Sequence, residues 1–167
     1  HDSNLNVCQS CGYHDLIKRA KRTKLLLEEN TIDKIQIKKI DDDPLDFKDL
    51  KKYSDRLKDS NKKTEQDECI LLAKGKIESF PVIIAAFDFR FMGGSMGRSV
   101  GNAFITGASI AVDQKCAFIT IPSSGGARMQ EGIISLMQMP RTIAALQMIE
   151  DAKLPHIVIP VSYTHLT

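Results

Sequence analysis

The sequence lacks the features that would place it in several large classes of protein. It has no apolar run long enough to span a membrane, although 43% of its 167 residues are hydrophobic. A leader of charged and then apolar residues is missing too, since residues 1–6 are largely polar, so nothing here argues for secretion. The formal net charge of +2 is too small to indicate a nucleic-acid or membrane partner by itself. We therefore expect a cytoplasmic protein with one substantial hydrophobic core.

Cysteine is scarce, and the four cysteines do not suggest a disulfide framework. Cys69 and Cys116 adjoin apolar residues, which is typical of buried reduced thiols in a reducing compartment. Cys8 and Cys11 form a C-x-x-C that could hold one zinc ion, but zinc takes four ligands and His14 is the only other candidate nearby. The C-x-x-C could be half of a zinc ribbon or a turn that binds no metal, and both interpretations remain open. A thioredoxin-like redox pair is disfavoured, because no βαβ unit precedes it.

Charge is distributed unevenly along the chain. Residues 1–76 carry 17 of the 23 Lys and Arg and 15 of the 21 Asp and Glu. The first part is therefore a solvated region of mixed charge and the second a core-forming region, with a boundary near Lys63 to Cys69. We expect three parts: a partial zinc ribbon at 1–14, a charged helical segment at 15–68 and a core domain at 69–167.

Hydrophobic spacing predicts the elements of both regions. Residues 13–30 and 41–60 read as charged helices, the second beginning around Pro44 to Asp46 with Leu50, Tyr53 and Leu57 as its apolar stripe. Strands alternating with helices after a hairpin favour an α/β core with both sheet faces covered. The expected core elements are strands at 70–78 and 81–89 separated by Ser79 and Phe80, a helix at 99–114, a strand at 116–121, a helix at 128–151 kinked at Pro140, and a strand at 156–161.

A first glycine-dense loop, "MGGSMG", occupies residues 92–97. It matches neither phosphate fingerprint: a Walker A motif needs Lys and Ser/Thr after its last glycine, and the Rossmann spacing is absent. A tight turn into the next helix explains it adequately. The alternative is a backbone surface that lets a ligand approach closely.

A second loop lies within "TIPSSGGARMQEG", residues 120–132. No His, Cys or Asp lies close enough along the chain to pair with a nucleophile. Gly125 and Gly126 at a helix N-terminus would leave unpaired N–H groups pointing outward, an arrangement that binds an anion or a developing oxyanion. An ordinary helix start with two glycines remains the alternative.

The side chains that follow are explained without catalysis. Arg128 could meet a phosphate or pair with Glu131, and Glu131 suits the first turn of a helix. We expect Met129, Met137 and Met139 to belong to the core.

Several motifs together resemble one family. "DFRFMGGSMGRSVG", "SSGGARMQEG" and "SLMQM", with "CQSCGYH" and "YSDRL", are similar to the beta subunits of the bacterial and plastid acetyl-coenzyme A carboxylase carboxyltransferase. The resemblance runs from about Val7 to about Val161. It implies a crotonase-like (ClpP/crotonase) α/β fold of ββα units behind a four-cysteine zinc ribbon, with Cys8 and Cys11 as the second pair of zinc ligands. It also implies the cytoplasm, or the plastid stroma for a plastid protein.

The resemblance also implies a reaction. The family transfers a carboxyl group from carboxybiotin, on the biotin carboxyl carrier protein, to acetyl-coenzyme A, forming malonyl-coenzyme A. Its partners are an alpha subunit, in an α2β2 assembly, and biotin carboxylase. A thioester enolate needs its oxygen stabilised, which backbone N–H groups do without a titratable side chain. Gly125 and Gly126 would be catalytic, and substrate would contact Gly93, Gly94, Ser95, Gly97, Ala127 and Arg128.

The chain departs from that family at its end. Where the family continues into a further Gly-Gly loop, this sequence reads "VSYTHLT", so residues 161–167 look like a foreign tail. We expect a fragment that is inactive alone and that binds zinc weakly, because half of the zinc ligands and one oxyanion loop are missing.

Two other functions remain as alternatives. Another crotonase-fold enzyme, a thioester hydratase or isomerase, needs pocket carboxylates, and Glu131 is the only one in these motifs. A zinc-ribbon module that binds nucleic acid would use the basic residues Lys18, Arg19, Lys21, Arg22 and Lys24, although nearby acidic residues offset their charge.

Overall fold

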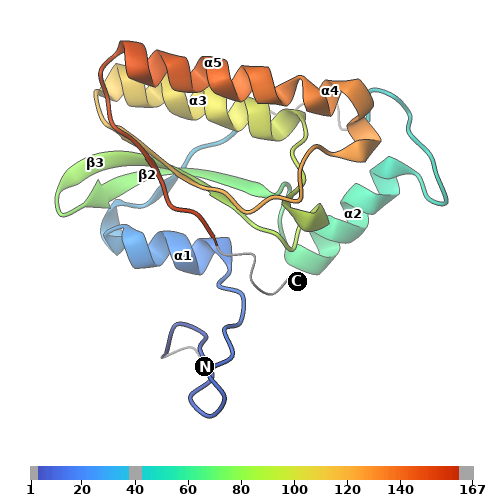
Figure 1. Ribbon diagram of the computed structural model, residues 1–167, viewed down its shortest axis with the longest axis horizontal. Coiled ribbons are helices and arrows are strands. Elements are labelled where there is room, and N and C mark those ends of the chain that lie inside the picture. Colours follow the sequence, from blue (N-terminus) through green and yellow to red (C-terminus); the bar gives the residue numbers. More distant parts are fainter. Residues whose placement is uncertain (1–3, 38–42, 162–167) are drawn as a thin grey trace.

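The computed structural model describes residues 4–37 and 43–161 (Figure 1). Within these residues the chain forms one mixed sheet with helices on both faces. The helices are α1 (Arg19–Leu26), α2 (Tyr53–Thr64), α3 (Arg98–Gln114), α4 (Gly132–Leu136) and α5 (Gln138–Asp151), with short 3-10 turns at Glu29–Thr31, Met92–Gly94 and Met129–Glu131. The strands are β1 (Asp33–Lys34), β2 (Ile70–Ile77), β3 (Phe80–Phe87), β4 (Ala117–Ile121) and β5 (His156–Val158).

The strands lie in the order β1-β2-β3-β4-β5. β2 and β3 form the predicted antiparallel hairpin, and β3, β4 and β5 are parallel. The hairpin turn is Glu78 and Ser79, one residue earlier than predicted, and both have positive φ (47° and 71°). Positive φ at both central residues matches the twist of the flanking strands, which explains why the turn closes there.

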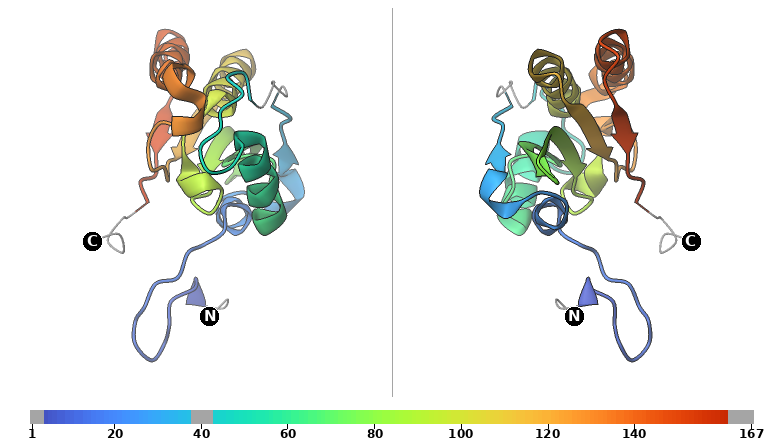
Figure 2. Two further views of the ribbon diagram at one scale, coloured as in Figure 1. Left: turned by 90° about the vertical axis from the view of Figure 1, so that its right-hand side faces the viewer. Right: turned by 90° about the vertical axis from the view of Figure 1, so that its left-hand side faces the viewer.

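Two helices cover one face of the sheet and one covers the other. α3 and α5 lie side by side on one face, where α3 contacts β2, β3 and β4 and α5 contacts β5, while α1 lies on the other face against β3 (Figures 1 and 2). Because both faces are covered, consecutive residues of β3 are buried; Ile83, Ile84, Ala85 and Ala86 have no exposed surface. The predicted α/β core is therefore confirmed.

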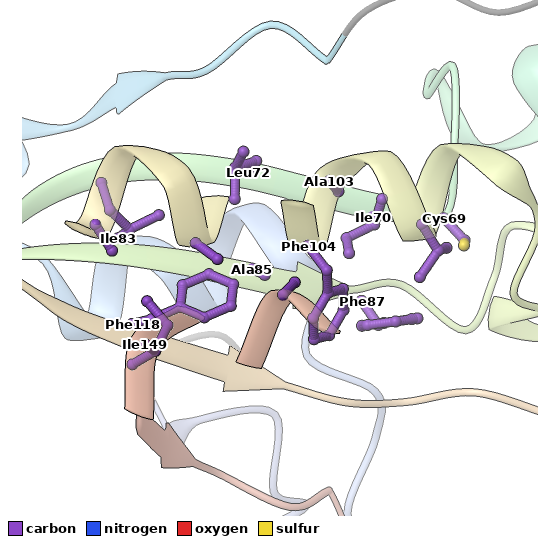
Figure 3. Packing of buried hydrophobic residues seen from close by; sticks show 14 of the residues in the cluster. Cys69, Ile70, Leu72, Ile83, Ala85, Phe87, Ala103, Phe104, Phe118 and Ile149 are labelled. Atoms are coloured by element: carbon purple, nitrogen blue, oxygen red, sulfur yellow. The ribbon is translucent and has the colours of Figure 1, made fainter. Parts of the chain in front are cut away.

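The core under α3 and α5 is packed around aromatic side chains. The rings of Phe104 and Phe118 meet edge to face with centroids 5.9 Å apart, and Leu72, Ile83 and Ile149 complete this layer (Figure 3). Position 107 requires glycine, because a Cβ there would come within 2.8 Å of the Phe118 ring and 2.9 Å of Leu72. The close approach of α3 to the sheet follows from that glycine.

The two charged helices are shorter than predicted. α1 begins at Arg19 rather than at residue 13, because the preceding residues pair with the N-terminal hairpin; the Asp15 N–H donates to the carbonyl of Asn6. α2 begins at Tyr53 rather than near Pro44 to Asp46. Leu50, predicted in its apolar stripe, is fully exposed before the helix, so that part of the prediction is wrong.

The predicted helix at 128–151 is divided in two. α4 ends at Leu136 and α5 begins at Gln138, so the interruption lies just before Pro140. Pro140 sits in the first turn of α5, where a missing N–H costs little. The stripe predicted to enter the core is instead exposed, by 64%, 49% and 52% at Met129, Met137 and Met139.

The segment predicted as charged helices also contributes to the sheet. β1, at Asp33–Lys34, pairs with β2 and extends the sheet at one edge. In the part of the chain that the structure describes, no helix combines the length and the apolarity that crossing a membrane requires. Residues 162–167, predicted as a foreign tail, lie outside the described residues.

Candidate functional site

The two glycine loops meet at one edge of the sheet. Residues 92–97 come shortly after β3 and residues 123–128 follow β4, and the carboxyl ends of these neighbouring parallel strands lie at the same edge. The Gly125 N–H donates to the carbonyl of Gly93 (2.9 Å) and the Met96 N–H to that of Gly126 (2.7 Å), while the Arg128 N–H returns to Met96 (3.0 Å). Two motifs that are 25 residues or more apart in sequence thus form one backbone-lined site.

The glycines of this site serve different purposes. A Cβ on Gly94 would overlap the carbonyl oxygen of Ser123, and one on Gly97 would overlap the Glu131 carboxylate. By contrast, a Cβ on Gly93 or Gly126 would meet no atom within 4 Å. Those two positions face open space and are glycine for their backbone conformation, with φ of 64° and 108°.

The N–H groups of the second loop are not arranged as predicted. Regular helix begins only at Gly132, after a 3-10 turn at 129–131, so Gly125 and Gly126 do not form a helix N-terminus. The Gly125 N–H is used within the site, and the Gly126 N–H donates to the hydroxyl of Ser124 (3.1 Å). The prediction of unpaired N–H groups is therefore wrong. The Ser124 hydroxyl that accepts this bond also donates to the carbonyl oxygen of Gly126 (3.5 Å).

Arg128 lies behind the loops rather than facing a ligand. Only 1% of its surface is exposed, and both terminal nitrogens of its guanidinium donate to the Glu68 carboxylate. The guanidinium also bonds Ser95 twice, from Nη2 to the carbonyl oxygen (2.8 Å) and from Nε to the hydroxyl (3.1 Å). Its position over the Phe91 ring, 5.8 Å from the centroid, adds a cation–π contact. The geometry gives Arg128 no surface for the substrate contact that the sequence predicted.

Glu131 is also turned inward. One oxygen of its carboxylate accepts from the Tyr53 hydroxyl (2.8 Å), and the other accepts from the backbone N–H of Arg98 (2.8 Å), the first residue of α3. Glu131 therefore caps α3, where its charge opposes the positive end of the helix dipole. Of the two roles that the sequence left open for Arg128, a phosphate contact or a pair with Glu131, the structure shows the pair, at 3.5 Å.

The charges behind the loops are fixed at neutral pH. Burial disfavours the ionised form of Glu68, but the hydrogen bonds and charge of Arg128 outweigh it, and the pKa of Glu68 lies below its ordinary value. Burial likewise opposes the charge of Arg128, yet Glu68 raises the pKa of Arg128 above its usual range. Burial raises the pKa of Tyr53, so its hydroxyl remains a proton donor to Glu131. Arg128 is the only ionisable side chain in either loop.

Two members of this network, Tyr53 and Glu68, are not among the residues that the sequence predicts for the site. Tyr53 belongs to the "YSDRL" motif but reads as part of an apolar stripe, and Glu68 sits at the predicted boundary between regions. Both are brought to Arg128 by tertiary contacts across 75 and 60 residues. Tyr53, Glu68 and Glu131 also line a cavity of about 490 Å³ between α2 and β2.

The C-x-x-C forms a compact hairpin that projects from the body of the molecule (Figures 1 and 2). The Cys8 N–H donates to Tyr13, and the Gly12 N–H returns to Cys8 with φ of 71° at Gly12. Backbone N–H groups of Cys11 and Ser10 bond the Cys8 sulfur and lower the pKa of its thiol, which suits a metal-binding thiolate. The residues therefore fit two ligands of a zinc ion. Across residues 4–37 and 43–161, no three His, Cys, Asp or Glu residues gather as a complete metal site.

Solved structures define the class of fold. Transcarboxylase 12S, with methylmalonyl-coenzyme A and methylmalonic acid bound, superposes with a TM-score of 0.65 at 23% identity, covering 87% of this chain and 26% of the other. The Pseudomonas malonate decarboxylase MdcD–MdcE hetero-dimer gives 0.62 at 17%, covering 85% and 51%. The chain thus shares the fold of these two proteins, and the predicted α/β class is confirmed. The half zinc ribbon stays a prediction.

Sequence relatives identify the family. The family model described as "Carboxyl transferase domain" matches residues 42–162, and the chain belongs to this family. The acetyl-coenzyme A carboxylase carboxyl transferase subunit beta of Dinoroseobacter shibae is 48% identical over 156 residues, covering 93% of this chain and 49% of the relative. That of Granulibacter bethesdensis is 46% identical over 158 residues, covering 95% and 52%. The chain therefore spans about half the length of these relatives.

Proposed function

We propose that this chain carries the first oxyanion site of an acetyl-coenzyme A carboxylase carboxyltransferase beta subunit. The reaction moves a carboxyl group from carboxybiotin to the methyl carbon of acetyl-coenzyme A and yields malonyl-coenzyme A. The observation that carries the proposal is the junction of the two glycine loops, where the Gly126 N–H bonds a serine hydroxyl and a Cβ on Gly126 would meet no atom within 4 Å. Relatives with the same name across almost the whole chain support it.

The backbone of Gly126 supplies the main chemical requirement of that reaction. The methyl group of the thioester would lose a proton to the biotin from which the carboxyl group has departed, which leaves an enolate whose oxygen carries the negative charge. The methyl carbon then forms the new carbon–carbon bond to that carboxyl group. The Ser124 hydroxyl oxygen occupies the acceptor position that the thioester oxygen would take. An N–H donor held in place stabilises that oxygen without reorganising, and such a donor contributes about a hundredfold or more in rate.

The other predicted site residues divide between contact and support. Gly93 and Ala127 lie beside Gly125 and Gly126 at the loop junction, and the absence of a Cβ on Gly93 leaves room for a bulky thioester. Gly94 and Gly97 allow the loops and Glu131 to pack closely, and Ser95 receives Arg128. We assign substrate contact to the first group and support to the second.

Other subunits complete the proposed enzyme. Carboxybiotin, held by the biotin carboxyl carrier protein and loaded by biotin carboxylase, supplies the carboxyl group, and an alpha subunit completes an α2β2 assembly in the cytoplasm or the plastid stroma. In support, the relatives are named as subunit beta, and a structural neighbour is a hetero-dimer. α4 and α5 also expose a set of apolar side chains that an assembled enzyme would cover: Ile133, Leu136, Met137, Met139, Ile143 and Met148. Cys8 and Cys11 would hold zinc together with ligands from outside the described residues.

The competing enzyme class is less well supported. A thioester hydratase or isomerase needs a carboxylate that faces the reacting carbon. Glu131, the carboxylate of these motifs, is buried and caps α3, and Glu68 is paired with Arg128. Both carboxylates are therefore occupied by contacts within the protein.

The test is a product assay on the protein expressed from its whole coding sequence and assembled with an alpha subunit. With carboxylated carrier protein and acetyl-coenzyme A, malonyl-coenzyme A should form, whereas an unsaturated acyl-coenzyme A should not be hydrated. Hydration without carboxyl transfer would replace the proposal by the competing class.

A further inference from the structure

Glu68 is a largely enclosed acidic residue that the proposed chemistry does not use. It lies just before β2, outside both glycine loops, and its side chain is 14% exposed. Its carboxylate accepts hydrogen bonds from both terminal nitrogens of Arg128 and from the backbone N–H of Cys69 (2.7 Å). A carboxylate that accepts two parallel bonds fixes the plane and direction of a guanidinium, not only its charge.

Arg128 in turn holds the two loops together. Its own backbone belongs to the second loop, whereas its side chain bonds the carbonyl and the hydroxyl of Ser95 in the first. The backbone bonds from Met96 to Gly126 and from Arg128 to Met96 lie directly beside these contacts. A rotation of the guanidinium would therefore loosen the Ser95 contacts first and then the backbone bonds that place Gly126.

The remaining partners of Arg128 cannot replace Glu68. Tyr53 is neutral and accepts one hydrogen bond from Nη1 (3.1 Å). Glu131 is 3.5 Å away, and its carboxylate already accepts from Tyr53 and Arg98. The Cys69 sulfur, 3.7 Å from Nη2, is a weak acceptor, and burial raises the pKa of its thiol. Among the described residues, Glu68 thus supplies the only carboxylate that binds the guanidinium through both of its oxygens.

We propose that Glu68 is a positioning residue for the glycine-loop site, which acts through Arg128 to fix the joined loops and hence the direction of the Gly126 N–H. Its catalytic consequence rests on the proposed function, but its effect on the loops does not. Glu68 acts through Arg128, because Arg128 is the residue of the two loops that its carboxylate binds.

The first experiment measures backbone amide hydrogen exchange in the chain carrying Glu68→Gln. The amides of Met96, Gly125 and Arg128 should exchange at least about tenfold faster than in wild type, because they form the bonds between the loops. Amides of the β2–β3 hairpin should keep their wild-type rates. Glu68→Asp, which keeps the charge on a shorter side chain, should give an intermediate increase.

Asp49→Asn is the matched control. Asp49 also accepts hydrogen bonds on both carboxylate oxygens from an arginine, Arg56, but this pair lies at α2 and is more exposed than the pair of Glu68 and Arg128. Its loss should leave the loop amides unchanged. Unchanged loop exchange in Glu68→Gln, or an equal increase in loop and hairpin amides, would overturn the proposal.

A double variant covers the case in which Glu68→Gln unfolds because Arg128 is left buried without its partner. Glu68→Gln with Arg128→Met removes the buried charge while retaining much of the side-chain length. It should fold and still show fast exchange at Met96 and Gly125. Wild-type protection of those amides in this variant would show that the pair does not position the loops.

The second experiment measures turnover in the assembled enzyme. Glu68→Gln should lower kcat by about tenfold or more while changing KM for acetyl-coenzyme A less than about threefold. The reason is that a misdirected Gly126 N–H would weaken stabilisation of the transition state more than binding of the substrate. An unchanged kcat together with loosened loops would refute the catalytic consequence. If wild-type enzyme forms no malonyl-coenzyme A, the proposed function fails, and the exchange experiment still decides the role of Glu68.

Discussion

The two glycine loops have similar composition but different physical demands. In residues 92–97, Gly94 and Gly97 leave no room for a side chain, because the Ser123 carbonyl and the Glu131 carboxylate occupy that space. In residues 123–128, Gly126 has open space around it and needs only an unusual backbone angle, with φ of 108°. The first loop is mainly a packing surface and the second mainly an accessible backbone. A glycine motif can therefore contain both glycines that allow close packing and glycines that leave the backbone accessible. Single substitutions can distinguish the two kinds.

The largest effect is expected at Gly94. An alanine there would place its Cβ against the Ser123 carbonyl, a backbone group that cannot rotate away, and would also adopt φ of 64°. We predict that Gly94→Ala lowers the free energy of unfolding by about 3 kcal/mol or more, as overpacking against backbone does. Chemical denaturation measures this. A midpoint near that of wild type would show that the loops are less tightly joined than described.

A smaller loss is expected at Gly97. The obstructing group there is the end of the Glu131 side chain, which can move, but only by leaving the N–H of Arg98 at the start of α3. We predict that Gly97→Ala costs about 1–2 kcal/mol, comparable to the loss of a helix cap. Glu131→Gln, which keeps one acceptor for that N–H, should cost less in the same denaturation series. The reverse order would contradict the capping role.

Acid should weaken the contacts of Asp88, which lies between β3 and the first loop. Burial disfavours the charge of Asp88, but hydrogen bonds from Arg90 and Gln66 outweigh it and lower the pKa of Asp88 to about 2. Its stabilisation is therefore complete above the unfolded value of 3.8 and is lost as the pH falls towards 2. We predict a loss of about 1–2 kcal/mol over that interval, which denaturation at stepped pH would measure. Asp88→Asn should flatten this part of the profile, and an unchanged slope would exclude Asp88 as its cause.

The smallest effect is expected at Gly93. It has φ of 64°, and a Cβ at this position would have no neighbour within 4 Å, so only backbone strain opposes substitution. Gly93→Ala should cost about 1 kcal/mol, the usual penalty for this left-handed region. Gly93→Asn should cost less in the same denaturation measurement, because asparagine tolerates that conformation. A loss as large as that of Gly94→Ala would remove the distinction between packed and open glycines.

Sequence patterns predicted the parts of this molecule that depend on local order. The hairpin of β2 and β3, the helix α3 and the strand β4 follow from hydrophobic runs and turn residues, and both glycine loops stand out in the sequence. The joining of those loops could not be predicted, because it depends on strand order and on bonds such as that from Met96 to Gly126.

Side-chain roles were harder to predict than loop positions. The position of Arg128 next to a glycine motif suggested a ligand contact. Only the tertiary structure shows that its guanidinium pairs with Glu68, 60 residues away in sequence. The helix start expected at Gly125 and Gly126 failed for a related reason: the N–H of Gly125 is used by Gly93 of the other loop. The exposed side chains of Met129, Met137 and Met139 show the same limit, since an apolar stripe does not reveal what covers it.

The central claim is that the backbone at Gly126 stabilises the reacting thioester oxygen, and substitution of Gly126 tests it most directly. The measurement is kcat for malonyl-coenzyme A formation by the assembled enzyme carrying Gly126→Ala, beside its midpoint of denaturation. The new methyl group would enter the open space beside the loop, so kcat should fall about a hundredfold or more while the free energy of unfolding falls by only about 1–2 kcal/mol. Turnover within about twofold of wild type would contradict the assignment of this site.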